Sequence, residues 1–287
     1  MSAGFKEKTM HAVFLFCAGA SIAAVALICI FLFANGIPGL AKIGVFNFLT
    51  GREWRPVDSP PVFGILPMIT GSLYVTAGAV VIGVPVGILT AVYMAAVCPK
   101  KIYVFAKPAA ELLAGIPSIV YGFFGLMVIV PVIRNIFGGS GTSLLAASVL
   151  LGIMILPTVV GISESALRAV PDAYFEGALA LGAGKMRAWY FVMLPAAKSG
   201  VFASVVLGIG RAVGETMAVI MVAGNQSRMP AGLTRGVRTL TANIVMEMSY
   251  AADLHREALI ATGVVLFVFI MIINLSFSAI NSRINKK

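Results

Sequence analysis

The sequence predicts an all-α, polytopic membrane protein with about six transmembrane helices. Of its 287 residues, 60% are hydrophobic and 11% are charged, whereas soluble domains carry about 25% charged residues. The mean hydropathy is +1.00, and the apolar residues gather in long runs, as they do in membrane spans. These observations exclude a soluble enzyme built around a single packed core.

Six apolar runs are long enough to cross the hydrocarbon layer, which takes about 20 helical residues. They cover residues 12–34, 65–97, 112–133, 144–163, 200–223 and 259–280. The first run is too long for the core of a signal peptide, which has about 7–15 residues, so we expect it to be retained. The second run contains Pro85 and exceeds one straight span, which leaves open whether it starts along the membrane surface.

The distribution of basic residues predicts that both termini are cytoplasmic. With the amino terminus inside, most of the 21 Lys and Arg residues fall on the inner side, in agreement with the positive-inside rule. Residues 35–64 and 225–258 are then outer loops, residues 164–199 form a cytoplasmic loop, and the chain 1–287 is a single transmembrane domain. The net charge of +10 does not indicate nucleic-acid binding, because the basic residues form no compact patch.

The cytoplasmic loop contains a predicted short helix over residues 172–182. Pro171 suits the start of a helix, Asp172 and Glu176 lie where the helix dipole favours acids, and Gly182 is a natural stop. The segment also carries apolar side chains, and exposed apolar surface of this kind usually marks a binding partner. We therefore expect this helix to dock onto another protein.

The same segment resembles the EAA loop of ABC importer permeases, in which Glu-Ala-Ala, Gly, Ile and Leu-Pro recur at fixed intervals. The matching positions here are Glu176, Gly177, Ala178, Gly182, Val192, Leu194 and Pro195. Gly177 and Val192 depart mildly from the pattern. In that family the loop forms a coupling helix that docks into a separate ATPase subunit, and the resemblance implies the same role for this helix. An amphipathic surface helix with chance spacing is the alternative.

Two further segments resemble the phosphate importer permeases, specifically the PstC type. They are Gly-Ile-Pro-Ser-Ile-Val-Tyr-Gly at 115–122 and Gly-Arg-Ala-Val-Gly-Glu-Thr-Met-Ala at 210–218. The resemblance extends along nearly the whole chain and implies a permease of the type I ABC importer fold in a bacterial cytoplasmic (inner) membrane. It also implies alternating access and three partners, namely a sister permease in a heterodimer, a homodimeric ATP-binding subunit and an extracytoplasmic phosphate-binding protein.

The chain is not expected to be an enzyme or to bind a cofactor. It has no P-loop, because Gly184-Lys185 is followed by Met186 where Ser or Thr is needed. It also shows no metal-ligand spacing. ATP and Mg²⁺ are therefore expected on the partner ATPase.

Arg211 and Glu215 lie inside the fifth predicted span, four residues apart, so one helix face is expected to carry both. A charge at this depth costs about 2.5–3.5 kcal/mol and must face a bundle interior or a water-filled cavity. Guanidinium stays charged and can offer two parallel donors to phosphate. We expect Arg211 to form part of an anion path and Glu215 to hold it in position; a structural ion pair is the alternative.

Two other functions compete with phosphate import. The chain is alternatively a permease for a related oxyanion, such as phosphonate, sulfate or molybdate, or a proton-coupled secondary carrier that uses Glu215. Among the remaining charged residues, Arg228, Arg235 and Arg238 are expected to be solvated or to contact anionic lipid; receiving phosphate or docking a binding protein is the alternative. His255 lies at a membrane edge and is expected to belong to no cluster.

Overall fold

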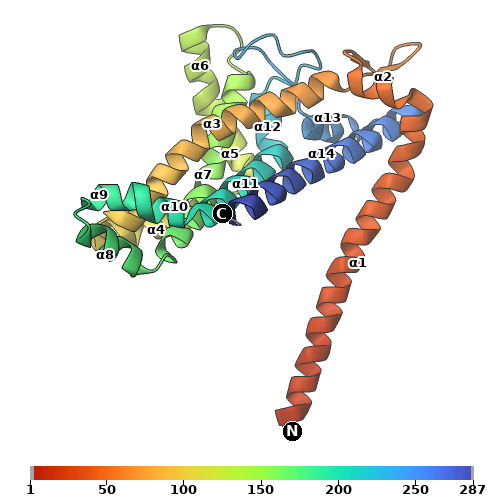
Figure 1. The fold of residues 1–287 in the computed structure, drawn as a ribbon. Helices are drawn as coiled ribbons and strands as arrows, with labels where there is room; N and C mark the ends of the chain where they lie inside the picture. The colour runs from red at the N-terminus through yellow and green to blue at the C-terminus, as the bar shows by residue number, and fades with distance from the viewer. Residues whose placement is uncertain (1–2, 286–287) are drawn as a thin grey trace.

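The computed structural model describes residues 3–285, which fold almost entirely into helices (Figure 1). The predicted cytoplasmic ends include residues 1–2 and 286–287, which lie outside the described residues. In chain order the elements are α1 (Ala3–Ile43), α2 (Val45–Thr50), β1 (Trp54–Arg55), β2 (Val62–Phe63), α3 (Leu66–Ala96), α4 (Lys100–Gly115), α5 (Ser118–Phe124), η1 (Gly125–Ile129), α6 (Val130–Phe137), α7 (Leu144–Arg168), α8 (Asp172–Ala180), α9 (Lys185–Ala188), η2 (Trp189–Met193), α10 (Leu194–Ala196), α11 (Lys198–Gly214), α12 (Met217–Val222), α13 (Leu240–Glu247) and α14 (Asp253–Asn285).

The prediction of about six transmembrane helices is confirmed. By length and composition, four single helices (α1, α3, α7 and α14) and the continuous run Ser118–Phe137 can each cross a membrane. A sixth span results if the helices on either side of a 72° bend, Lys185–Ala196 and Lys198–Gly214, are counted together. The second span is one helix of 31 residues that passes through Pro85.

The predicted third span, 112–133, begins too early. Ile116 and Pro117 are extended, with ψ values of 127° and 140°, because a proline disfavours helical geometry in the residue before it. The membrane helix therefore starts at Ser118, and residues 100–115, predicted as part of a loop and the start of the span, form the separate helix α4.

The segment 35–64 is more ordered than the predicted loop. Helix α1 continues to Ile43, α2 follows, and β1 and β2 form a two-stranded antiparallel hairpin that pairs Trp54 with Phe63. Both of these aromatic side chains are buried and lie 5.6 Å apart between ring centroids. The segment 225–258 likewise contains α13 and the first turns of α14 rather than loop alone.

Helix α7 lies at the centre of the fold and packs closely against α3. A Cβ added at Gly83 of α3 would lie 2.6 Å from the carbonyl oxygen of Gly152, and one at Gly87 would lie 2.7 Å from Val159. These glycines allow the two backbones to approach, as small residues do between membrane helices. Within its apolar window, 61% of α7 is buried.

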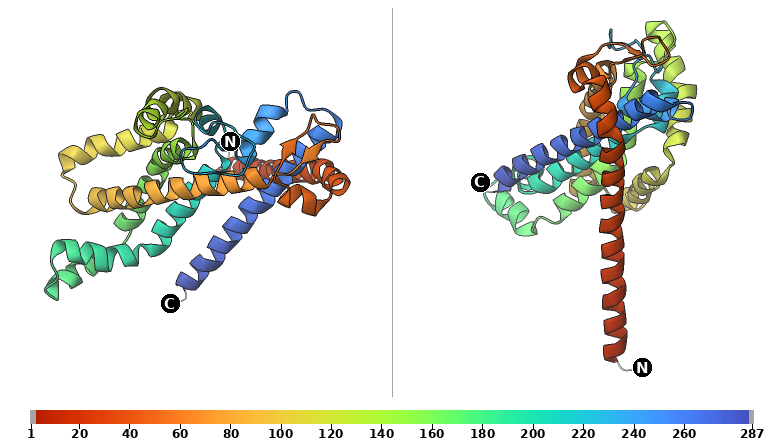
Figure 2. Two further views of the ribbon diagram at one scale, coloured as in Figure 1. Left: turned by 90° about the horizontal axis from the view of Figure 1, so that it is seen from above. Right: turned by 90° about the vertical axis from the view of Figure 1, so that its right-hand side faces the viewer.

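Helix α1 stands apart from this bundle. Figures 1 and 2 show its N-terminal part projecting away from the other helices, so that α1 meets α14 only toward its C-terminal end. That contact is close at Gly36 and Gly39, where an added Cβ would meet Val264 and Glu257 within 2.9 Å. None of the apolar window of α1 is buried in this chain.

A buried carboxylate ties together the end of the molecule that carries α2. Glu247 accepts hydrogen bonds from Trp54 Nε1 at 2.8 Å and Arg238 Nη1 at 2.5 Å, and His255 Nε2 lies 2.9 Å away. The sequence-based expectations for Arg238 and His255 were therefore wrong. Both side chains are largely buried because they converge on Glu247 from either side of α13, together with the remote Trp54.

Replacing Glu247 by Ala should strongly destabilise the folded protein. The change leaves Arg238 buried without its counter-ion, a loss that costs about 3–5 kcal/mol in buried pairs. We expect the thermal unfolding midpoint of the detergent-solubilised protein to fall by several degrees. The matched control is Glu53→Ala, whose partner Arg55 is exposed, and whose loss should cost less than about 1 kcal/mol. Equal midpoints for the two variants would contradict the role of the cluster.

Candidate functional site

The fifth predicted span is interrupted at the residues expected to carry the anion path. Helix α11 ends at Gly214, Glu215 is extended with φ −70° and ψ 134°, and α12 begins at Met217. Gly208, Gly210 and Gly214 weaken the helix on the approach to this break. The prediction of one continuous helix over 200–223 was therefore wrong.

Glu215 is held by the backbone beyond the break. Its Oε1 accepts hydrogen bonds from the N–H of Thr216 at 3.1 Å and of Ala218 at 3.2 Å. Its own carbonyl oxygen accepts from Thr241 Oγ1 at 3.0 Å, which connects the break to α13. The carboxylate thus satisfies N–H groups that a helix start leaves without partners.

Arg211 lies in the last turn of α11 and is partly buried. Its Nη1 donates one long hydrogen bond, 3.4 Å, to Thr158 Oγ1 on α7. Within residues 3–285, no carboxylate lies within 4.0 Å of its guanidinium. The expectation that Glu215 holds Arg211 on a shared helix face was wrong, because the break turns the carboxylate toward the start of α12.

The glycines around Arg211 serve two different purposes. A Cβ added at Gly208 would lie 3.2 Å from Val159, so this glycine permits close packing of α11 on α7. At Gly210 and Gly214 an added Cβ would meet nothing within 4 Å in the described chain. The backbone of α11 next to Arg211 is therefore unoccupied by the rest of the described chain at these two positions.

The predicted coupling helix is present as α8. It begins after Pro171 and ends in a Schellman motif, in which Gly182 N–H donates to Leu179 and Ala183 N–H donates to Ala178. Gly182 has φ +84°, a conformation that favours glycine. The local part of the prediction is thereby confirmed.

The surface of α8 is largely exposed. Glu176 and Gly177 are exposed, whereas Ala178 is buried. Tyr174 and Leu181 also stand out, with exposed fractions of 54% and 91%. Within the EAA-like segment, the helix thus offers an apolar and acidic surface beside its buried alanine.

Leu194 and Pro195 lie where the segment that follows α8 leads into α11. Phe175 of α8 packs on Trp189 with ring centroids 5.6 Å apart, and Trp189 begins the π-helical turn η2. Leu194 and Pro195 then form α10, which meets α11 at the 72° bend. The loop is therefore connected by contact and by chain to the helix that carries Arg211.

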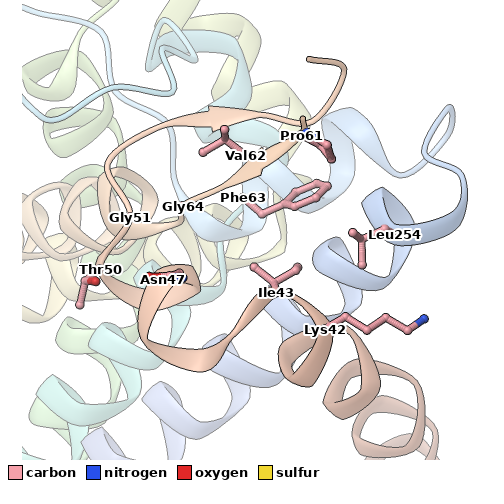
Figure 3. A pocket seen from close by; sticks show the side chains of 10 residues that line it. All are labelled: Lys42, Ile43, Asn47, Thr50, Gly51, Pro61, Val62, Phe63, Gly64 and Leu254. Carbon is pink, nitrogen blue, oxygen red and sulfur yellow. The ribbon is translucent and has the colours of Figure 1, made fainter. Parts of the chain in front are cut away.

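A separate cavity of about 500 Å³ lies beside the β hairpin, and none of the predicted site residues lines it. Figure 3 shows Ile43, Phe63 and Leu254 around it, with the side chain of Lys42 at its edge. Lys42 forms an ion pair with Glu257 at 2.6 Å. Since this cation already has a counter-ion, the cavity is a poorer anion site than the surroundings of Arg211.

The sequence analysis missed a second buried carboxylate, Glu164 of α7. It accepts hydrogen bonds from Tyr103 Oη at 2.9 Å and from Lys107 Nζ at 2.7 Å, both on α4, and from Arg168 Nε. The hydrogen bond to Glu164 raises the pKa of Lys107, so the lysine stays charged at neutral pH. The spacing of Glu164 and Arg168, four residues apart, was the signal in the sequence for an ion pair on one helix. The partners of Glu164 on α4 are 57 and 61 residues away in the sequence, so the spacing does not reveal them.

The comparisons with known proteins agree with this geometry. Residues 83–286 match the family described as binding-protein-dependent transport system inner membrane component. The chain is 39% identical to the Probable ABC transporter permease protein YqgH of Bacillus subtilis over 93% of this chain and 88% of that protein. It is 35% identical to the phosphate transport system permease protein PstC of Mesorhizobium japonicum, over 86% and 81% respectively.

Solved structures show the same fold. A structure of the inward-facing MetNI methionine ABC transporter matches with a TM-score of 0.61 and 20% identity, covering 77% of this chain and 95% of that chain. A second MetNI structure matches with a TM-score of 0.57. The family match covers well over half of the sequence. This chain therefore belongs to the binding-protein-dependent transport system inner membrane components, the permease subunits of ABC importers.

Proposed function

We propose that this chain is the membrane-spanning permease subunit of an ATP-driven importer that moves inorganic phosphate into the cytoplasm. The relatives named as phosphate transport permeases support this substrate, since several are more than 30% identical over most of the chain. The observation that carries the proposal is Arg211, a cation within a membrane span that has no carboxylate partner among the described residues.

The surroundings of Arg211 suit a transient phosphate ligand. A guanidinium can offer parallel donors to an oxyanion, and only one long hydrogen bond to Thr158 uses those donors here. Glu215 is directed to the backbone of α12 and does not neutralise the cation. The negative charge of Glu215, four residues further along the chain, would nevertheless repel an anion and limit how tightly phosphate binds, which favours passage over trapping.

Alternating access supplies the mechanism. A phosphate-loaded binding protein docks on the outer side, and closure of two ATP-bound ATPase subunits moves α8. The contact between the tilted rings of Phe175 and Trp189 transmits that movement to η2, and the bend after Pro195 leads it into α11. Arg211 then exposes its anion to the opposite side of the membrane.

The assembly we propose contains partners beyond this chain. A sister permease completes the pathway as a heterodimer, a homodimeric ATP-binding subunit binds ATP and Mg²⁺, and an extracytoplasmic protein delivers phosphate. The EAA-like segment, with Glu176, Gly177, Ala178, Gly182, Leu194 and Pro195, is the proposed contact with the ATPase. The location we propose is a bacterial cytoplasmic membrane, with both termini inside.

The first test measures ATP hydrolysis and phosphate uptake by the complex that copurifies with this chain, reconstituted in vesicles. We expect phosphate-loaded binding protein to stimulate both. Stimulation only by sulfate, molybdate or a phosphonate would contradict phosphate as the substrate but still support an ABC importer. If no ATPase copurifies with an otherwise intact complex, the proposed role of α8 is wrong. The alternative function, a proton-coupled carrier that uses Glu215, would then be favoured.

Arg211→Gln should reduce phosphate uptake about 10- to 100-fold, because hydrogen bonds to a charged group contribute about 1.5–3 kcal/mol. Uptake of radiolabelled phosphate by vesicles measures the change. Arg55→Gln is the control, since Arg55 forms only exposed ion pairs with Glu53 and Asp58. Normal uptake by the assembled Arg211 variant would contradict the anion-path role.

Replacing both Tyr174 and Leu181 by Ala should weaken ATPase binding at least about tenfold while the permease stays folded. These side chains are exposed in the isolated chain, and burying such a side chain contributes about 1.5–3 kcal/mol. Copurification of the ATPase and the thermal unfolding midpoint are measured together. Val57→Ala removes an equally exposed side chain at the other end of the molecule and should leave binding intact. Retained ATPase in the double variant counts against the proposed contact surface.

A further inference from the structure

We propose that Glu164 is a positioning residue that clamps α4 to the coupling end of α7 and so makes α4 a second mechanical link between the ATPase and the anion path. The inference rests on the proposed function. It concerns a cluster that neither the EAA-like segment nor the Arg211 site contains.

The cluster joins three helices at one point. Glu164 is only 1% exposed and accepts from Tyr103 and Lys107 of α4. Arg168 also donates to Glu164, and its Nη2 donates to the carbonyl oxygen of Met94 at the end of α3, 2.9 Å away. Its guanidinium carbon lies 4.5 Å from the centre of the Tyr103 ring. Glu164 therefore holds α4 to α7, and Arg168 holds the end of α3 to the same point.

Helix α4 has little apolar burial of its own to hold it to the bundle. None of its residues is fully buried, and Phe105 and Leu112 are 78% and 74% exposed. An element with so little apolar burial has low local stability unless specific contacts hold it. The bonds from Tyr103 and Lys107 supply those contacts to α7.

The clamp lies next to the coupling helix. Arg168 is the last residue of α7, and Pro171, which precedes α8, follows three residues later. Figure 1 shows α4, α8 and α9 at the same end of the molecule. A displacement of α8 therefore acts directly on the end of α7 to which α4 is attached.

From α4 a continuous set of contacts leads to the anion site. Tyr121 of α5 donates from its Oη to the carbonyl oxygen of Leu113 at 2.8 Å, which bridges the extended residues between α4 and α5. A Cβ added at Gly122 would lie 2.9 Å from the Cα of Ala218, so α5 packs tightly on the first turn of α12. The N–H of Ala218 is one of the two groups that hold Glu215.

This route is independent of the one through η2 and α11. The first route moves Arg211, whereas the second moves the short helix whose start holds Glu215. Loss of the contacts between Glu164 and α4 should let the ATPase hydrolyse ATP without moving α12 and Glu215. Coupling free energies between two sites typically change a binding affinity by about 5- to 150-fold. We expect an effect of similar size on the amount of phosphate moved per ATP.

The test compares Glu164→Gln with Glu111→Gln in the full complex reconstituted in vesicles. Both acids lie within 4.0 Å of Lys107 Nζ, but Glu111 is 67% exposed and Glu164 is 2% exposed at the side chain. The readout is phosphate moved per ATP hydrolysed. We expect this ratio to fall about tenfold in Glu164→Gln, with stimulation of ATP hydrolysis by the loaded binding protein retained, and to stay at the wild-type value in Glu111→Gln.

A merely structural role would lower uptake and hydrolysis together and leave their ratio unchanged, and that result would overturn the inference. If Glu164→Gln fails to assemble, Lys107→Met is measured instead, because it leaves Glu164 paired with Arg168. A wild-type ratio in that variant would equally overturn the inference. A wild-type complex that moves no phosphate would refute the proposed function, which is a distinguishable result.

Discussion

The close approach of α3 to α7 is the constraint on which the rest of the structure depends. It requires glycine where the backbones meet, because a Cβ at Gly83 would collide with the carbonyl oxygen of Gly152. With α7 fixed in this way, Thr158 faces Arg211 and Glu164 faces α4. One buried helix thus positions both the candidate anion site at Thr158 and the Glu164 cluster near α8.

Removing a charge from water is costly, and the charged side chains inside this fold differ in how that cost is compensated. Glu247 and Glu164 are surrounded by cationic and hydroxyl or indole donors, while Glu215 accepts from the backbone at a helix start. Arg211 differs, because among the described residues its guanidinium makes one long hydrogen bond, to a neutral oxygen. A cation that contributes so little to holding the fold together fits the proposed role of a transient anion ligand.

Local features of the fold were predictable and remote ones were not. The ends of α8 follow from Pro171 and Gly182, which act within one helix turn, and the spans follow from apolar runs. The Glu247 cluster joins residues 193 positions apart in the chain, and α4 is attached to Glu164 across 57 positions. At Glu215 the expected i, i+4 pair with Arg211 does not form. The helix has ended there, and the carboxylate accepts hydrogen bonds from backbone N–H groups instead. Helical spacing alone does not reveal where a helix ends.

The break also changes what Arg211 and Glu215 can do together. On one continuous helix their separation would be fixed, and the carboxylate would neutralise the cation in every state of the transporter. Here Arg211 belongs to α11, which the coupling loop enters through a 72° bend, and Glu215 is bound to α12, which packs on α5. Motion between these two elements therefore alters the distance from guanidinium to carboxylate. An anion beside Arg211 would be bound more strongly when that distance is long and more weakly when the carboxylate approaches, so motion between the two helices would change the affinity of the proposed anion site.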